Sequence, residues 1–123
     1  MMIVKPPADA YAGPPDPEQH AAMGRYNDEL RHEGVLLEVD GLMSTAHGAK
    51  VKFKADKRTV TDGPFSEAKE VIGGYWIIEV RSKAEALAWA QKIPFSTEVH
   101  PGEEVEVEVR QIAEHDDHKG SSR

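Results

Sequence analysis

The chain has 123 residues, the length of one domain, with 39% hydrophobic and 30% charged residues, a composition that excludes a membrane protein and a wholly disordered chain. The absence of cysteine excludes disulfide scaffolds, thiolate zinc sites and thiol nucleophiles, and a net charge of −7 disfavours nucleic acid and anionic membranes as partners. Because the first apolar run, residues 1–4, is too short for a signal-peptide core, we expect a cytoplasmic protein.

The N-terminal part predicts one strand and one long helix. The strand covers Met2–Lys5, and two proline pairs prevent regular pairing in the loop that follows. The helix is expected from Pro17 to Glu33, because Asp16 suits its N-cap and Gly34 its C-terminal end. Its apolar stripe has the i, i+3, i+7 spacing of a helix that packs one face on a core: Met23, Tyr26 and Leu30.

The middle of the chain predicts strands. Val35–Val39 is rich in β-forming residues, and Ala49–Lys54 alternates apolar residues with lysines. A turn at Asp56-Lys57 then leads to a returning strand over Thr59–Thr61. Gly74–Val80 is apolar on both faces, which predicts a central strand that is covered on two sides.

The C-terminal part predicts a helix, a last strand and a tail. Ser82 and Glu85 form a capping box, and Pro94 ends the helix. The last strand, Glu104–Ile112, alternates valines with charged residues, and residues 114–123 are expected to be a disordered tail. The buried face of the helix is expected to hold Ala86, Leu87, Trp89, Ala90 and Ile93.

This element order maps onto a ferredoxin-like, split β-α-β sandwich of the α+β class. Two helices cover only one face of its sheet, so either Tyr75 and Ile77 or Trp76 and Ile78 lack a cover. The simplest way to bury this uncovered sheet face is to pack it on the same face of a second copy, and we therefore predict a homodimer.

Two rows of opposite charge have the same period of two residues. A lysine row lies on the strand Ala49–Lys54, and a glutamate row begins at Glu104. If these strands approach one another, within one protomer or across a dimer, the rows neutralise each other as cross-strand pairs. We prefer this interpretation to a phosphate site because the net charge is −7.

Residues 62–70 hold the densest cluster of turn residues and titratable groups in the chain. Gly63-Pro64 bends the backbone after Asp62, which stands at the end of a strand. In one interpretation the Asp62 carboxylate bonds its own backbone in a turn, while Phe65 plugs the core.

A second interpretation of this segment is catalytic. Asp62, with Glu67 or Glu70 nearby, would lie at the rim of a pocket floored by Tyr75 and Trp76. A partly desolvated carboxylate there has a raised pKa and can move protons. The two aromatic residues also suit a purely structural place in the core.

Four segments together resemble one protein family. They are DGPFSEAKE at 62–70, GGYWIIEV at 73–80, MGRYNDELRHEGVLL at 23–37 and PGEEVEVEVRQI at 101–112. They are similar to the DGPF, or DGPFAETKE, branch of the YCII-related proteins, over nearly all of the chain up to Ile112. The resemblance implies one domain over residues 1–113, a dimeric α+β barrel of ferredoxin-like protomers, and a family without an established activity. Some relatives are fused to, or encoded beside, sigma factors, which implies the alternative of a non-catalytic regulatory module with a sigma-factor partner.

The wider family has a recurrent histidine on the first helix and an aspartate after the second. In this chain Met23 stands at the first position and Ile93 at the second, so no His/Asp dyad is carried over. His20 lies almost one turn earlier on the helix. The resemblance to the DGPF branch implies that Asp62 is the functional carboxylate.

For an enzyme we therefore expect cofactor-free proton transfer or hydrolytic, lyase-like chemistry on a small-molecule ligand. Asp62 would act as base, Glu67 or Glu70 would assist, and Tyr26 or His20 would orient the substrate. The other residues expected at this substrate site are Phe65, Tyr75 and Trp76. We expect no cofactor and no metal, since the tract His115-Asp116-Asp117-His118 resembles a metal site in composition only.

Overall fold

The computed structural model describes residues 1–5, 17–65, 72–95 and 105–114. The predicted loop 6–16, the segment 66–71, the start of the last predicted strand and the tail from residue 115 lie outside the described residues. The fold is mixed α+β, with antiparallel sheets and two α-helices. In chain order the elements are β1 (Met2–Lys5), α1 (Pro17–His32), β2 (Leu36–Gly41), η1 (Thr45–His47), β3 (Ala49–Lys54), β4 (Lys57–Asp62), β5 (Gly74–Ile78), α2 (Lys83–Gln91) and β6 (Glu106–Val109).

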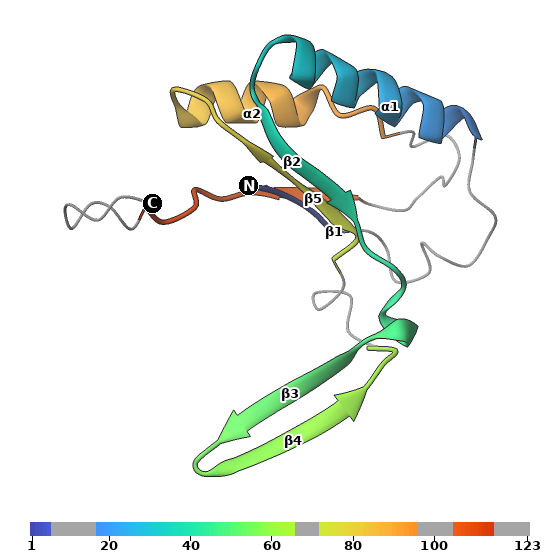
Figure 1. Ribbon diagram of the computed structural model, residues 1–123, viewed down its shortest axis with the longest axis vertical. Helices are drawn as coiled ribbons and strands as arrows, with labels where there is room; N and C mark the ends of the chain where they lie inside the picture. Colours follow the sequence, from blue (N-terminus) through green and yellow to red (C-terminus); the bar gives the residue numbers. More distant parts are fainter. Residues whose placement is uncertain (6–16, 66–71, 96–104, 115–123) are drawn as a thin grey trace.

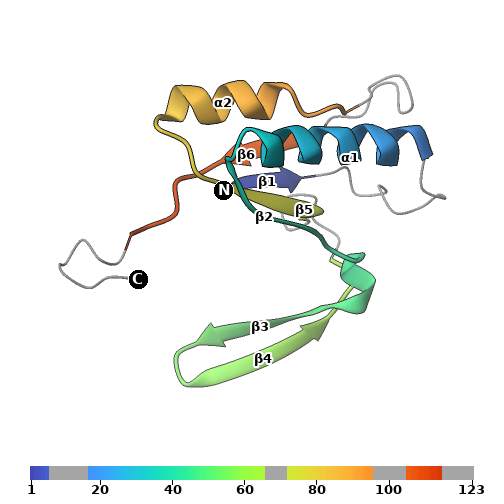
Figure 2. The same cartoon turned by 45° about the horizontal axis from the view of Figure 1, so that its top comes forward.

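Four strands form the main sheet, in the order β2-β5-β1-β6. Each neighbouring pair is antiparallel, so β1 and β2, which α1 connects, run in the same direction on either side of β5. Both helices lie on one face of this sheet (Figures 1 and 2). No helix among the described residues is long and apolar enough to cross a membrane.

The core lies between the helices and the sheet. Met2 and Leu30 have no exposed surface, and Tyr26 and Trp76 are also buried. The rings of Tyr26 and Trp76 meet edge to face with their centroids 5.6 Å apart. The Tyr26 hydroxyl donates a hydrogen bond of 2.7 Å to the carbonyl oxygen of Trp89, which ties α1 to α2. The predicted stripe on α1 is therefore the face that packs on the core.

No helix of the described residues lies over the opposite face of the main sheet. Met2 pairs with Trp76 on the core side, and the next pair, Ile3 with Tyr75, points the other way because side chains alternate along a strand. The cross-strand register places further residues on this side, which we call the open face. It consists of Ile3, Lys5, Glu38, Asp40, Tyr75, Ile77, Glu106 and Glu108.

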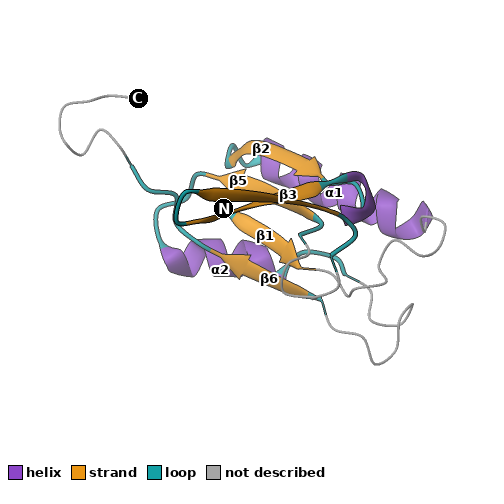
Figure 3. Ribbon diagram, turned by 90° about the horizontal axis from the view of Figure 1, so that it is seen from below, coloured by secondary structure: helices purple, strands orange, loops and turns teal. Residues whose placement is uncertain are grey.

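The strands β3 and β4 form a separate two-stranded sheet, which we call the hairpin (Ala49–Asp62). It extends away from the main sheet on the side opposite the helices (Figures 1 and 2), and it crosses in front of the sheet when the molecule is seen from that side (Figure 3). All residues from 51 to 62 are exposed.

The hairpin separates the two charged rows within the protomer. β3 pairs with β4 and β6 pairs with β1, so the predicted lysine–glutamate pairing within one protomer is wrong for the described residues. Instead, Lys5 Nζ lies 2.8 Å from Glu108 Oε1. Pairing of the two rows across a dimer stays a prediction.

The second helix has a narrower buried face than predicted. Ser82 caps α2 as expected, since its Oγ accepts a hydrogen bond of 3.1 Å from the Glu85 amide. Ala86 and Ile93 are buried, but Leu87 is 39% exposed and its placement in the core was wrong. Residue 87 is turned by about 100° from residue 86 around the helix axis, which carries it off the stripe that faces the sheet.

Candidate functional site

The described part of the DGPF segment closes the base of the hairpin. The Gly63 amide donates to the Gly48 carbonyl oxygen at 2.8 Å, and the Phe65 amide donates to Thr45 Oγ1 at 3.1 Å. The Lys50 ammonium lies 4.7 Å from the centre of the Phe65 ring. Phe65 is therefore half-buried at the hairpin base and does not plug the core, because the hairpin stands away from the helices.

The predicted catalytic carboxylates are not brought together among the described residues. Asp62 is the last residue of β4, opposite Ala49, and is exposed. Within the part of the chain that the structure describes, no hydrogen bond reaches its carboxylate. Glu67 and Glu70 lie outside the described residues. Both interpretations of Asp62 stay predictions.

Three predicted substrate-binding residues lie on the helical side of the sheet. Tyr26 and Trp76 are core residues whose polar atoms already have protein partners, since Trp76 Nε1 donates to Asn27 Oδ1 at 2.7 Å. His20 is exposed on α1. The structure thus separates these residues from Tyr75, which lies on the open face.

Tyr75 forms an acid–base pair on the open face. Its hydroxyl donates a hydrogen bond of 2.5 Å to Glu38 Oε2. This hydrogen bond raises the pKa of Tyr75, and desolvation and the negative charges of Glu38 and Asp40 act in the same direction. Tyr75 is a protonated phenol at neutral pH, as an ordinary tyrosine is, and the raised pKa extends this state to higher pH.

The other edge of the open face carries a cluster of opposite charges. Lys5 Nζ lies 2.8 Å from Glu108 Oε1, and Arg110 Nε donates to Glu108 Oε2 at 2.6 Å. The hydrogen bonds from Lys5 and Arg110 hold the pKa of Glu108 below its ordinary value. Between this cluster and the Tyr75–Glu38 pair lie Ile3 and Ile77.

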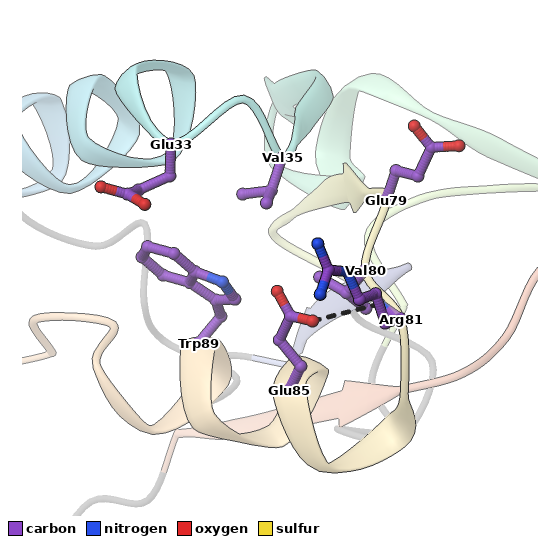
Figure 4. A pocket seen from close by; sticks show the side chains of 7 residues that line it. All are labelled: Glu33, Val35, Glu79, Val80, Arg81, Glu85 and Trp89. Atoms are coloured by element: carbon purple, nitrogen blue, oxygen red, sulfur yellow. Dashed lines mark hydrogen bonds between the residues drawn. The ribbon is translucent and has the colours of Figure 1, made fainter.

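Two pockets lie near the end of β5, away from the hairpin base. The smaller one has a volume of about 530 Å³ and is bounded by the residues after α1, the residues after β5, and α2 (Figure 4). Glu85 Oε1 accepts a hydrogen bond of 3.1 Å from the Arg81 amide at its edge. Its lining is Glu33, Val35, Glu79, Val80, Arg81, Glu85 and Trp89.

The larger pocket has a volume of about 740 Å³ and reaches the open face at Ile77. Ile77 and Leu37 line it together with the N-terminus, the first residues of α2 and the residues after β6. Of the predicted site residues that the structure describes, none lines either pocket. Among the described residues, no group of three or more His, Asp and Glu side chains could hold a metal ion.

Glu38 and Asp40 were missed by the sequence analysis. They alternate with apolar residues on one strand, as do carboxylates on the wet face of many sheets. Their position opposite Ile77 and Tyr75 depends on the register between β2 and β5, which shifts at an irregularity between Leu36 and Glu38.

Known proteins that are similar to this chain identify its family. An uncharacterized protein of Rhizobium meliloti (strain 1021) is 37% identical to this chain over 60 residues, which are 49% of this chain and 48% of that protein. The matched region thus spans about half the length of this curated relative. The model of the YCII-related domain matches residues 1–113. The chain therefore belongs to the YCII-related family.

Proposed function

We propose that this protein acts as a homodimer of ferredoxin-like protomers whose open faces meet and enclose a small-molecule cleft. The strand order β2-β5-β1-β6, with both helices on one face, supports the ferredoxin-like classification. The open face supports the dimer, because Ile3 and Ile77 stand at its centre and neither described helix covers them. The net charge of −7 supports a protein that makes no direct contact with nucleic acid, and we propose a cytoplasmic location.

The proposed binding site rests on the hydrogen bond between Tyr75 and Glu38. It places a donor and an acceptor on the open face, next to the apolar side chains of Ile3 and Ile77. Ile77 also lines the pocket of about 740 Å³, so the cleft extends from Tyr75 toward that pocket. A small molecule with an apolar body and a carbonyl or carboxylate group fits this combination.

The chemistry that this arrangement supports is cofactor-free proton transfer, or a hydrolytic, lyase-like reaction. The Tyr75 hydroxyl has one proton, so on ligand binding it would exchange its hydrogen bond to Glu38 for one to the ligand oxygen on which negative charge develops when a neighbouring carbon loses a proton. Glu38 is one candidate for the base. Asp62 of the DGPF segment is the other, with Glu67 or Glu70 assisting it and with Phe65 near the substrate.

A ligand screen tests the proposed site. The dimer is screened by thermal shift against small carbonyl compounds and carboxylic acids, and dissociation constants of the hits are measured by calorimetry. We expect Tyr75→Phe to weaken binding by about tenfold, the loss of one hydrogen bond to a charged or polarised oxygen. Tyr26→Phe, on the covered face, is the matched control and should bind like the unmodified protein. Equal binding of every hit by Tyr75→Phe would contradict the proposed site.

The same hits distinguish the two candidate bases. If a hit is converted to product, Asp62→Asn and Glu38→Gln are compared at saturating ligand. The variant that binds the compound but no longer converts it identifies the base. If both variants retain full turnover, neither carboxylate is the base.

A non-catalytic regulatory module that binds a protein partner, such as a sigma factor, is the second candidate function. It is favoured by exposed apolar side chains outside the open face, since Phe53 is 65%, Val60 66% and Met43 71% exposed. For this function, Tyr75→Phe should leave partner binding unchanged, and polar substitution of Phe53 should weaken it.

A further inference from the structure

The hairpin exposes one apolar face and one lysine face. The register pairs Val51 with Val60 and Phe53 with Arg58, so these four residues share a face. Val51, Phe53 and Val60 are 50%, 65% and 66% exposed. A two-stranded sheet by itself is marginally stable in water, and it needs packing on its apolar face. The described protomer does not supply that packing, because all residues from 51 to 62 are exposed.

The charge of the hairpin differs in sign from that of the rest of the chain. The hairpin has five cationic residues and two aspartates, a net charge of +3, and the remainder of the −7 chain therefore carries −10. Contact between two hairpins would bring like charges together. Contact between a hairpin and the remainder of another copy brings opposite charges together, which favours association and correct orientation.

The open face of a second copy has the complementary features. Ile3 and Ile77 provide an apolar centre, and Glu38, Asp40 and Glu106 place carboxylates toward its edges. The hairpin extends on the same side of the molecule as the open face (Figures 1 and 2). Two copies that meet through their open faces therefore each direct a hairpin toward the other.

We propose that the hairpin is an arm that packs its apolar face on a second copy of this chain, beside the partner's open face. The lysines on its other face then lie near acidic groups of that copy, within the screening length of about 8–10 Å at moderate salt. This inference rests on the proposed dimer. It identifies the hairpin as a segment that stabilises the dimer, and it predicts that the dimer dissociation constant depends on salt. The lysine row thereby acquires a role between copies.

Sedimentation equilibrium of the full chain tests the arm. In a double variant, Phe53→Ser with Val60→Thr, we expect the dimer dissociation constant to rise by about tenfold, the usual effect of removing an apolar anchor. Met43→Ser is the matched control, since Met43 is 71% exposed and belongs neither to the hairpin nor to the open face. It should leave the constant unchanged. Circular dichroism checks that both variants keep the fold. The unmodified dimer should also weaken several-fold from low to high salt.

Zero-length carbodiimide cross-linking gives a second readout. Labelled and unlabelled copies are mixed, so that a cross-link between copies has a mixed isotopic mass. We expect such cross-links to join Lys52, Lys54 or Lys57 of one copy to carboxylates of the other.

The outcomes separate the arm from the dimer on which it rests. A monomer at every concentration overturns both. A dimer of unchanged strength in the double variant, without hairpin cross-links between copies, overturns the arm and leaves the dimer of open faces intact. If the double variant instead loses binding to an unlike protein while the dimer is unchanged, the arm is wrong and the second candidate function is supported.

Discussion

Tyr26 connects the two helices and the sheet through one side chain. Its ring meets Trp76 at 5.6 Å and Trp89 at 6.3 Å between centroids, both edge to face. Its hydroxyl donates to the Trp89 carbonyl oxygen. Burial raises the pKa of Tyr26 to about 12, and the negative charge of Glu29 adds to this effect. The residue is thus a structural anchor on the covered face, and its phenol is held protonated.

The raised pKa of Tyr26 predicts a loss of stability in alkali. The folded-state pKa of about 12 exceeds the ordinary value of 10.0. The contribution of the protonated Tyr26 phenol to the free energy of unfolding is therefore complete below pH 10 and is lost as the pH rises to 12. Between these values the free energy of unfolding should fall by about 2 kcal/mol more in the unmodified protein than in Tyr26→Phe. Urea denaturation across this pH range measures it. Parallel pH profiles for the two proteins would contradict the prediction. At neutral pH the variant should lose about 1 kcal/mol with the hydrogen bond.

At the scale of elements, the junction between η1 and the hairpin depends on Gly63. A side chain at this position would overlap the Thr45 carbonyl oxygen and would also approach the Gly48 carbonyl oxygen. These are backbone atoms, so the hairpin base or η1 would have to move. The glycine of the DGPF segment therefore has a packing reason in this structure, independent of any catalytic role of Asp62.

Gly63→Ala should separate the hairpin base from η1. We expect a loss of about 1–3 kcal/mol, as for other overpacked sites, together with faster hydrogen exchange of the amides at positions 63 and 65. The amides of the main sheet should keep their protection. Gly24→Ala is the control: apart from the neighbouring backbone of α1 itself, no atom lies within 4 Å of a Cβ added there, and within α1 the substitution should raise stability by about 0.5–1 kcal/mol. An unchanged exchange rate at positions 63 and 65 would show that the junction tolerates a side chain.

At the scale of the whole molecule, the proposed dimer depends on the uncovered face of the main sheet. The helices bury Met2 and Trp76 on one side of the sheet and leave Ile3 and Ile77 on the other. The carboxylates around this apolar centre keep a separate protomer hydrated at the edges of the face. An open face of this kind favours association through its centre and polar contacts at its rim.

Ile77→Glu tests this whole-molecule prediction. The substitution places a charge at the centre of the open face, where burial without a partner costs several kcal/mol, so the dimer should dissociate at all practical concentrations. The protomer should stay folded, since Ile77 is not part of the hydrophobic core cluster. Leu87→Glu, on a helix at 39% exposure, is the control that adds the same charge elsewhere and should stay dimeric. Light scattering measures the mass, and a dimer of Ile77→Glu would overturn the proposed interface.

The local elements of this protein follow from the sequence by itself. The predicted bounds of β1 and β3 agree with the structure, and α1 ends one residue earlier than predicted. The cap of α2 at Ser82 was also predicted correctly. These features depend on alternation, on capping side chains and on Gly34, that is, on residues a few positions apart. The resemblance to the YCII-related proteins came from the same short segments.

Only the tertiary structure decided which residues meet across the chain. It separated the hairpin from the main sheet, placed Glu38 beside Tyr75, and located the pockets at Glu79–Arg81, far from Asp62 in the fold. A period of two residues shows that a strand has an apolar face, but the neighbour of that face depends on pairing between distant segments. For that reason the sequence did not predict which side chains of the open face lie next to one another, although it contains each of these residues.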